Sequence, residues 1–166
     1  MEFCVKKHLA LLFLLAACAP KVTSTTTTAP VGETGAVNEP ARPSNVTGAS
    51  AARSAVEEFL TAVRSQDIQA MSVLFGTNRG PSRDNMNRDE LEKRLVILQC
   101  YFNHDRSRFL SESPGADGHR IIEMELTKQG ISRTPNFYAV QGPNSRWYVD
   151  NMEIAAVQDF CRKAGS

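Results

Sequence analysis

The sequence predicts an α+β fold in which N-terminal helices pack on a four-stranded antiparallel sheet. Two changes of pattern indicate this class. Between residues 50 and 102, apolar side chains recur every three or four positions, which is the spacing of one helix face. From residue 108 onward they alternate with polar ones, which is the spacing of a half-buried strand. We therefore expect one α+β domain at residues 50–163, preceded by two segments of other kinds at residues 1–17 and 18–49.

Residues 1–17 have the pattern of a signal peptide. Two lysines precede the apolar run 9–17, which at nine residues is too short for the roughly 20 that a membrane-spanning helix needs. The run ends in Leu15-Ala16-Ala17-Cys18, which resembles the lipobox of bacterial lipoproteins. Two other interpretations stay open. Ala17-Cys18-Ala19 fits cleavage by ordinary signal peptidase, and the segment could also remain as an uncleaved anchor.

The lipobox resemblance implies a lipid-modified N-terminus and a place in the bacterial cell envelope. In such proteins the thiol corresponding to Cys18 carries a diacylglycerol, and two or three acyl chains, palmitate among them, anchor a protein stably where one chain does not. Ala19 rather than an aspartate follows Cys18, which in double-membraned bacteria is typical of sorting to the outer membrane. We expect the mature protein to be held there, facing the periplasm.

Residues 18–49 are expected to form a disordered tether after the lipidated cysteine. Thr, Pro, Ala, Gly, Ser and Val dominate this stretch, and it has no aromatic residue. Such a segment cannot bury enough apolar surface to offset the entropy lost on ordering its backbone. A composition rich in Thr and Pro also tends to keep it extended.

Three helices are expected at the start of the domain. The first carries an apolar stripe from about Ser50 onward, made of Ala52, Val56, Phe59, Leu60 and Val63. Asp67 is placed to cap a second, short helix, and residues 79–86 follow as a polar, cationic loop. Asn87, with Glu90 three residues later, resembles a capping box and starts the third helix. Its buried face consists of Leu91, Leu95, Leu98 and Phe102.

Four strands and a closing helix are expected in the second half of the domain. The strand candidates are residues 108–113, 122–126, 137–141 and 147–154. The connections at 115–118, 129–130 and 142–145 are short and rich in glycine, so consecutive strands should pair antiparallel. A final short helix is expected at residues 155–162.

This order of elements has a counterpart among known families. The segments that carry the likeness are residues 55–63 (AVEEFLTAV), 65–67 (SQD), 74–75 (LF) and 147–152 (WYVDNM). Over residues 50–162 the chain resembles the nuclear transport factor two-like superfamily, in which a cone of helices is wrapped by a curved sheet. A different α+β layer, with helices on one face of the sheet, is the alternative.

The cysteines point to one disulfide. Cys4 would leave with the signal peptide and Cys18 would carry lipid, so Cys100 and Cys161 remain as a pair in an oxidising compartment. Closing this loop would constrain the unfolded chain by roughly 4 kcal/mol in the entropy model. Two buried free thiols are the alternative.

Enzymes of the superfamily place an acid or base inside the cone, and this resemblance selects candidate pocket residues. They are His119, Tyr138, Tyr148, Asp150 and Asn151. The residues alone favour plainer roles. His119 and His104 fit solvated turns, Asp150 and Asn151 fit hydrogen bonds in a strand or turn, and the two tyrosines fit packing.

Other site classes have no signal in the sequence. It contains no nucleophile elbow, no glycine-rich phosphate loop and no metal-ligand spacing, so we predict no catalytic residue, no cofactor and no metal. The 19 basic and 18 acidic side chains are balanced, and removal of Lys6, Lys7 and Glu2 keeps them so. This argues against a nucleic-acid partner.

The favoured function is therefore a non-catalytic binding or interaction module of the cell envelope. Its partner would be an envelope protein or a small apolar ligand, and its contact with the membrane would be the lipid anchor. One alternative is a small isomerase or dehydratase with a pocket inside the cone. The other is a structural homodimer formed through the outer face of the sheet, because residues 147–149 (WYV) are apolar on both faces.

Overall fold

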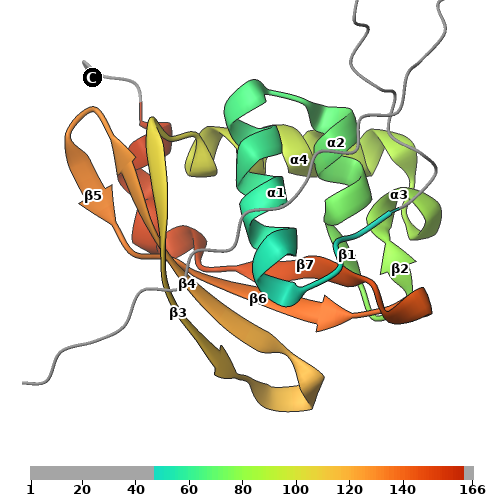
Figure 1. Ribbon diagram of the computed structural model, residues 1–166. Coiled ribbons are helices and arrows are strands. Elements are labelled where there is room, and N and C mark those ends of the chain that lie inside the picture. The colour runs from blue at the N-terminus through green and yellow to red at the C-terminus, as the bar shows by residue number, and fades with distance from the viewer. Residues whose placement is uncertain (1–46, 163–166) are drawn as a thin grey trace, which may run out of the picture. The chain divides into compact units, whose positions relative to one another are not determined.

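The computed structural model describes residues 47–162 (Figure 1). The expected signal peptide, the expected lipidation site Cys18 and most of the expected tether lie outside these residues. The α-helices are α1 (Ala52–Ser65), α2 (Ile68–Leu74), α3 (Ser82–Asn85) and α4 (Arg88–Phe102). The strands are β1 (Gly76–Thr77), β2 (Gly80–Pro81), β3 (Arg106–Pro114), β4 (Arg120–Lys128), β5 (Ile131–Arg133), β6 (Asn136–Gln141) and β7 (Trp147–Met152). Three 3₁₀ helices, η1 (Ala116–Gly118), η2 (Pro143–Ser145) and η3 (Ile154–Cys161), complete the elements.

The main sheet confirms the expected α+β class and the antiparallel pairing of its strands. Its order is β3-β4-β6-β7, and β5 pairs with β4. The sheet thus has five strands and not the predicted four. The fifth follows the turn at Gln129 and Gly130, and its three residues are too few to show a period of two.

The prediction of a polar loop at residues 79–86 is wrong. The chain instead forms the β1–β2 hairpin and the single-turn helix α3. Two glycines allow this tight arrangement. Gly80 has φ +111°, and a Cβ on Gly76 would lie 2.5 Å from the Gly80 carbonyl oxygen.

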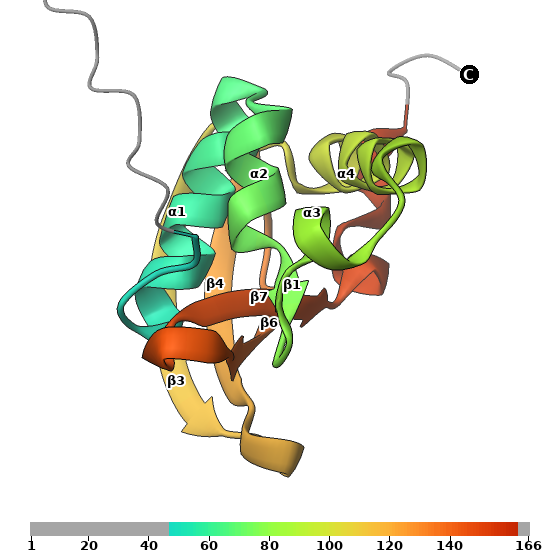
Figure 2. The same cartoon turned by 90° about the vertical axis from the view of Figure 1, so that its right-hand side faces the viewer.

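The helices lie on one face of the main sheet, and the core fills the space between them (Figures 1 and 2). Ile122, Met124 and Leu126 of β4 all point into this core, as their alternation predicts. The α4 stripe of Leu91, Leu95, Leu98 and Phe102 is also buried, which confirms the expected face. The rings of Phe102 and Phe137 pack with centroids 5.2 Å apart, and Phe59 is fully buried beside them in the same cluster.

The helix starts follow the capping signals of the sequence. The Asp67 carboxylate accepts a hydrogen bond from the Ala70 N–H at 2.9 Å, so Asp67 caps α2 as predicted. The Asn87 side chain accepts from the Asp89 and Glu90 N–H groups, which fixes the start of α4. These local bonds set where α4 begins, and hence which side it turns to the sheet.

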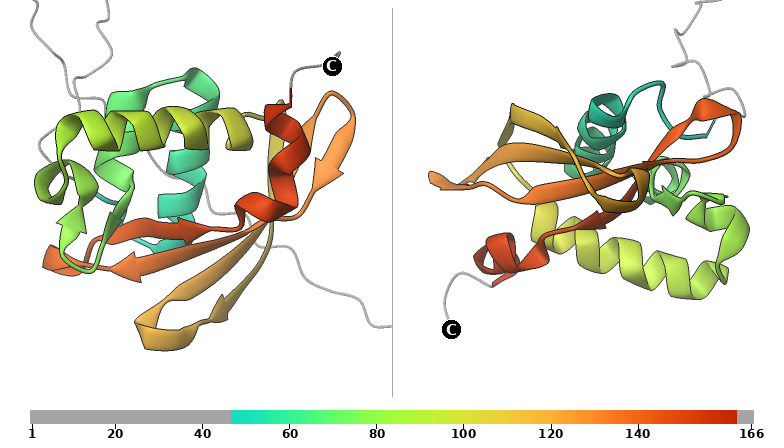
Figure 3. Two further views of the ribbon diagram at one scale, coloured as in Figure 1. Left: turned by 180° about the vertical axis from the view of Figure 1, so that it is seen from behind. Right: turned by 90° about the horizontal axis from the view of Figure 1, so that it is seen from below.

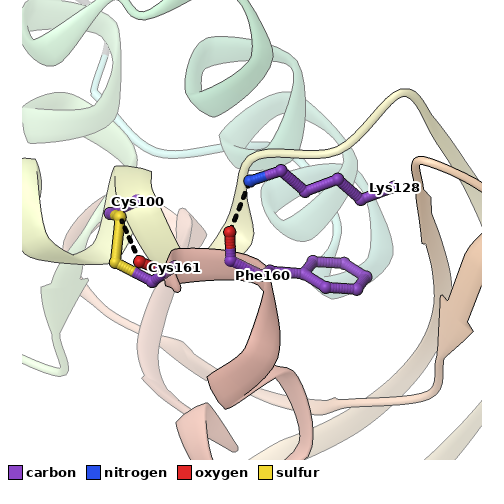
Figure 4. Close-up of a disulfide and its surroundings, with 4 residues drawn as sticks. All are labelled: Cys100, Lys128, Phe160 and Cys161. Carbon is purple, nitrogen blue, oxygen red and sulfur yellow. Dashed lines mark hydrogen bonds between the residues drawn. A yellow bond between two sulfur atoms is a disulfide. The ribbon is translucent and has the colours of Figure 1, made fainter. Parts of the chain in front are cut away.

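The predicted closing helix is present and is of the 3₁₀ type. It runs over Ile154–Cys161 and is interrupted at Val157. Val157 and Phe160 are both buried, and a spacing of three matches the three-residue turn of a 3₁₀ helix. The predicted Cys100–Cys161 disulfide is present and joins α4 to the end of η3 (Figure 4). Beside it, Lys128 Nζ donates to the Phe160 carbonyl at 2.6 Å.

The fold begins before residue 50, where the domain boundary was expected. Ala49 pairs with Trp147, and the Gly48 N–H donates to the Val73 carbonyl at 2.9 Å. The Arg146 guanidinium donates to the carbonyls of Thr47 and Gly48. Residues 47–49 therefore belong to the folded unit, because their backbone groups are bonded to it.

Candidate binding site

The five candidate pocket residues do not share one pocket. Tyr148 is buried and packs against Gly48, Gly76 and Gly142, so it is part of the packing. Tyr138 is half-buried, alternates along β6 with the core residues Phe137 and Ala139, and lies opposite Asn151 in the register. It is on the sheet face turned away from the helices. His119, Asp150 and Asn151 line the surface.

Asp150 owes its position to a bulge in β7. Tyr138 pairs with Asn151, but the next residue, Ala139, pairs with Val149. Asp150 is thus the extra residue of a β-bulge, and such a residue is re-aimed relative to the regular alternation of the strand. Its carboxylate meets His119, which precedes β4, with Nε2 and Oδ2 2.8 Å apart.

Both ring nitrogens of His119 are engaged. Nε2 contacts the Asp150 carboxylate, and Nδ1 contacts the Ala116 carbonyl oxygen at 3.0 Å. A carbonyl oxygen and an ionised carboxylate oxygen both accept, so this arrangement favours the protonated ring, which donates from both nitrogens. The bond to Asp150 raises the pKa of His119 accordingly. A general base needs a free nitrogen, which this arrangement does not offer.

The His119–Asp150 pair lies in a shallow depression of about 320 Å³ beside the β1–β2 hairpin. Thr77, Asn78, Arg79, Asp117 and Val140 complete its lining. The side chains of His119 and Asp150 are 24% and 30% exposed, so water reaches the pair. The pair therefore acts as an ionic clamp between the 115–119 turn and the β7 bulge.

His104 is buried, which contradicts the expected solvated turn. Only 4% of the residue is exposed, and Nδ1 donates to the Phe102 carbonyl at 2.8 Å. Burial lowers the pKa of His104, so the neutral ring is favoured. The turn is drawn inward because it directly follows Phe102, which is anchored in the core.

A second depression is lined by Asn151 and, from its other side, by Asp150, and it is the more apolar of the two. We call it the α4–β7 groove, and its volume is about 400 Å³. Its lining consists of Phe75, Glu90, Arg94, Ile97, Leu98, Asp150, Asn151, Met152 and Ile154. Figure 3 shows from behind how α4 runs along the β7 side of the molecule.

Ile97 is the residue of this groove that the sequence analysis missed. It is 55% exposed, whereas its groove neighbours Leu98 and Met152 are buried. The neighbouring Val96 is 51% exposed but does not line the groove. The available signal was a pair of apolar residues off the buried stripe of an otherwise charged helix. Contiguous exposed apolar surface marks binding sites, and Ile97 adjoins the apolar side chains of the groove lining.

The groove is bordered by charged side chains of both signs. Glu90 and Arg94 lie one turn apart on α4 and form an ion pair of 3.5 Å, and Asp150 lies across the groove on β7. Within residues 47–162, no group of three or more His, Cys, Asp or Glu side chains is placed to hold a metal ion. In the same range no helix combines the length and apolar character needed to cross a membrane.

Comparison with known proteins gives no relative from which to carry over a function. No protein-family model matches the chain, and no curated protein matches it. The functional argument therefore depends on the residues of this chain.

Proposed function

We propose that this protein is a lipid-anchored lipoprotein of the bacterial cell envelope whose folded unit is a non-catalytic binding module. The α4–β7 groove is its binding surface. We further propose that the domain is a nuclear transport factor two-like cone, held at the outer membrane and facing the periplasm. The partner is an envelope protein or a small apolar ligand.

The anchoring part of the proposal is supported by the N-terminal sequence. A charged start, a nine-residue apolar run and a cysteine directly after it occur in the order that lipoprotein precursors use. The Cys100–Cys161 disulfide is consistent with an oxidising compartment outside the cytoplasm. Residues 18–46 then supply a spacer between the acyl chains and Thr47, the first residue that the structure describes.

The observation that carries the binding part is Ile97. Ile97 is a large apolar side chain, more than half exposed, and it adjoins Leu98 and Met152 in the groove lining, so covering it with a partner would remove apolar surface from water. Polar side chains stand around it and would orient a ligand, as in small-molecule and peptide sites generally.

The two alternatives receive less support. An isomerase or dehydratase would need an acid or base facing a pocket inside the cone, where Phe59, Phe102 and Phe137 are packed. A homodimer was suggested by the apolar residues 147–149. Tyr148 of that run is covered within the chain by Gly48, Gly76 and Gly142, so its burial requires no second copy.

The anchor is tested by mass spectrometry of the mature protein isolated from bacterial membranes. We expect an N-terminal Cys18 bearing a diacylglycerol. A mature product that begins at another residue, with an unmodified thiol, contradicts the anchor.

The groove is tested with the neutral apolar dye Nile red and the full chain in lipid nanodiscs. Dye fluorescence should rise on addition of the protein, and Ile97→Arg should abolish the rise above that of empty nanodiscs. Val96→Arg places the same charge on the next residue of α4 and is the matched control, which should keep it. Equal signals from both variants would contradict the assignment of the groove.

A further inference from the structure

The open edge of β7 lies inside the α4–β7 groove. The first half of this edge is occupied, because Ala49 bridges Trp147 and Phe75 bridges Val149 through backbone groups. Among residues 47–162, no strand or bridge partner occupies the second half, Asp150–Met152, on the side away from β6. The groove therefore exposes part of a sheet edge.

The register shows which backbone group this edge offers. Glu153 N–H donates to the Asn136 carbonyl at 2.9 Å, and Met152 lies opposite Phe137. Because antiparallel strands alternate bonded and non-bonded pairs, the Met152 N–H points away from β6. Its acceptor is the side-chain Oδ1 of Asn151, at 2.8 Å. The exposed Asn151 side chain thus accepts from the Met152 N–H, the backbone donor that would otherwise bond to an added strand.

The helix beside this edge supplies an apolar wall. Ile97 and Leu98 of α4 face the edge across the groove, and Ile154 closes one end. An open strand edge next to an apolar helix wall suits an extended peptide, since backbone bonds give affinity and a side-chain pocket gives specificity.

The charged side chains at the rim are already paired with each other or with a neighbour. Glu90 pairs with Arg94 at 3.5 Å, and Asp150 pairs with His119 at 2.8 Å. The lining therefore favours an uncharged, apolar side chain on the peptide, placed against Ile97 and Leu98.

We propose that the partner of the α4–β7 groove is an extended segment of another protein, which adds to the open edge of β7 at Met152. It places an apolar side chain against Ile97. This inference rests on the proposed function and names its partner. The added segment continues the line of backbone contacts that Ala49 and Phe75 already make along the same edge.

The test uses the full chain in lipid nanodiscs and a synthetic library of capped heptapeptides, each with one central leucine. Peptides retained by the protein are labelled, and their dissociation constants are measured by fluorescence anisotropy. We expect Ile97→Arg to weaken binding roughly tenfold or more, and the control Val96→Arg to change it less than about twofold.

Two further variants test the pairing itself. N-methylation of the peptide amides on one edge should abolish binding, whereas methylation on the other edge should not, because only one edge pairs with β7. Asn151→Ala should strengthen binding by about two- to tenfold, since the peptide carbonyl no longer competes with the Asn151 side chain for the Met152 N–H. A purely structural Asn151 would give weaker or unchanged binding.

The outcomes separate this inference from the proposed function. Retained peptides that tolerate methylation on both edges, or that respond equally to the two arginine variants, overturn the strand-addition proposal. If no peptide is retained but Nile red binding depends on Ile97, the inference fails and the groove assignment stands. If neither probe binds, both fail.

Discussion

The interior of the domain and the α4–β7 groove are built from similar residues but differ in what covers them. In the interior, Phe59, Phe102 and Phe137 are fully buried by the helices and the sheet. In the groove, Ile97 is 55% exposed although Leu98, the next residue of the same helix, is buried. Since both regions use α4, one helix stabilises the fold with one face and leaves an apolar side chain exposed on another, as the proposed binding surface requires.

The comparison predicts opposite consequences for substitutions in the two regions. Interior changes should lower the free energy of unfolding, because they remove contacts already made. Groove changes should leave stability alone and alter binding.

The largest effect is expected from Phe102→Ala. It leaves a cavity against Phe137, so we expect the free energy of unfolding to fall by about 3–5 kcal/mol. Urea denaturation, followed by the fluorescence of Trp147, measures this. A fall below about 1.5 kcal/mol would break the comparison, because it would mean that the interior is loosely filled.

The disulfide joins two elements that line the groove, α4 and η3, and its removal sharpens the comparison. Cys100→Ser with Cys161→Ser should lower the free energy of unfolding by roughly 2–4 kcal/mol, because the bond closes a loop across a separation of 61 residues. The same pair ties α4 to η3, both of which line the groove, so Nile red binding should weaken too. If the folded double variant binds the dye as well as the wild-type protein does, the disulfide is not needed to position the groove.

His104 makes the stability of the domain depend on pH. Its pKa is lowered by burial, so the folded state favours the neutral ring while the unfolded state binds a proton near pH 6.5. The contribution of His104 to the free energy of unfolding is therefore full above that pH and falls as the solution is acidified. His104→Asn should flatten this acid loss in denaturation curves taken between pH 5 and 8, and an unchanged slope would contradict the buried neutral ring.

His119 should show the opposite dependence. Its pKa is raised by the bond to Asp150, so its contribution is full below about pH 6.5 and is lost as the pH rises through the folded pKa. The pair is partly exposed, which limits the effect to about 1 kcal/mol. His119→Asn should remove the loss on the alkaline side, and calorimetry at matched pH values measures it. If His119→Asn instead gained stability at acid pH, the result would contradict a protonated His119 paired with Asp150.

The smallest effect is expected from Ile97→Ser. The side chain makes few buried contacts, so the free energy of unfolding should change by no more than about 0.5 kcal/mol, as for exposed positions in general. Urea denaturation beside Val96→Ser tests this. A loss above about 1.5 kcal/mol would place Ile97 in the core and remove the contrast between the regions.

The sequence predicted the features that local chemistry decides. The caps at Asp67 and Asn87 and the α4 stripe were correct, because a cap and a helix period are properties of neighbouring residues. The disulfide followed from counting cysteines. Strands β1, β2 and β5 were missed because two or three residues cannot show alternation.

The site was harder to predict because it depends on residues far apart in the chain. Asp150 and Asn151 were singled out, yet the bulge that positions Asp150 is set by pairing with β6. His104 was misplaced because its burial depends on how the turn after Phe102 packs. Ile97 could be recognised as a groove residue only once the structure placed β7 across from it.

The contrast between filled interior and open groove is tested most directly by photolabelling. The full chain in lipid nanodiscs is irradiated with a small apolar diazirine, and the labelled positions are located by mass spectrometry. We predict labels within residues 90–98 and 150–154, lost in Ile97→Arg and kept in Val96→Arg. Labels on Phe59, Phe102 or Phe137, unaffected by either variant, would show an accessible pocket between the helices and the sheet and contradict the account.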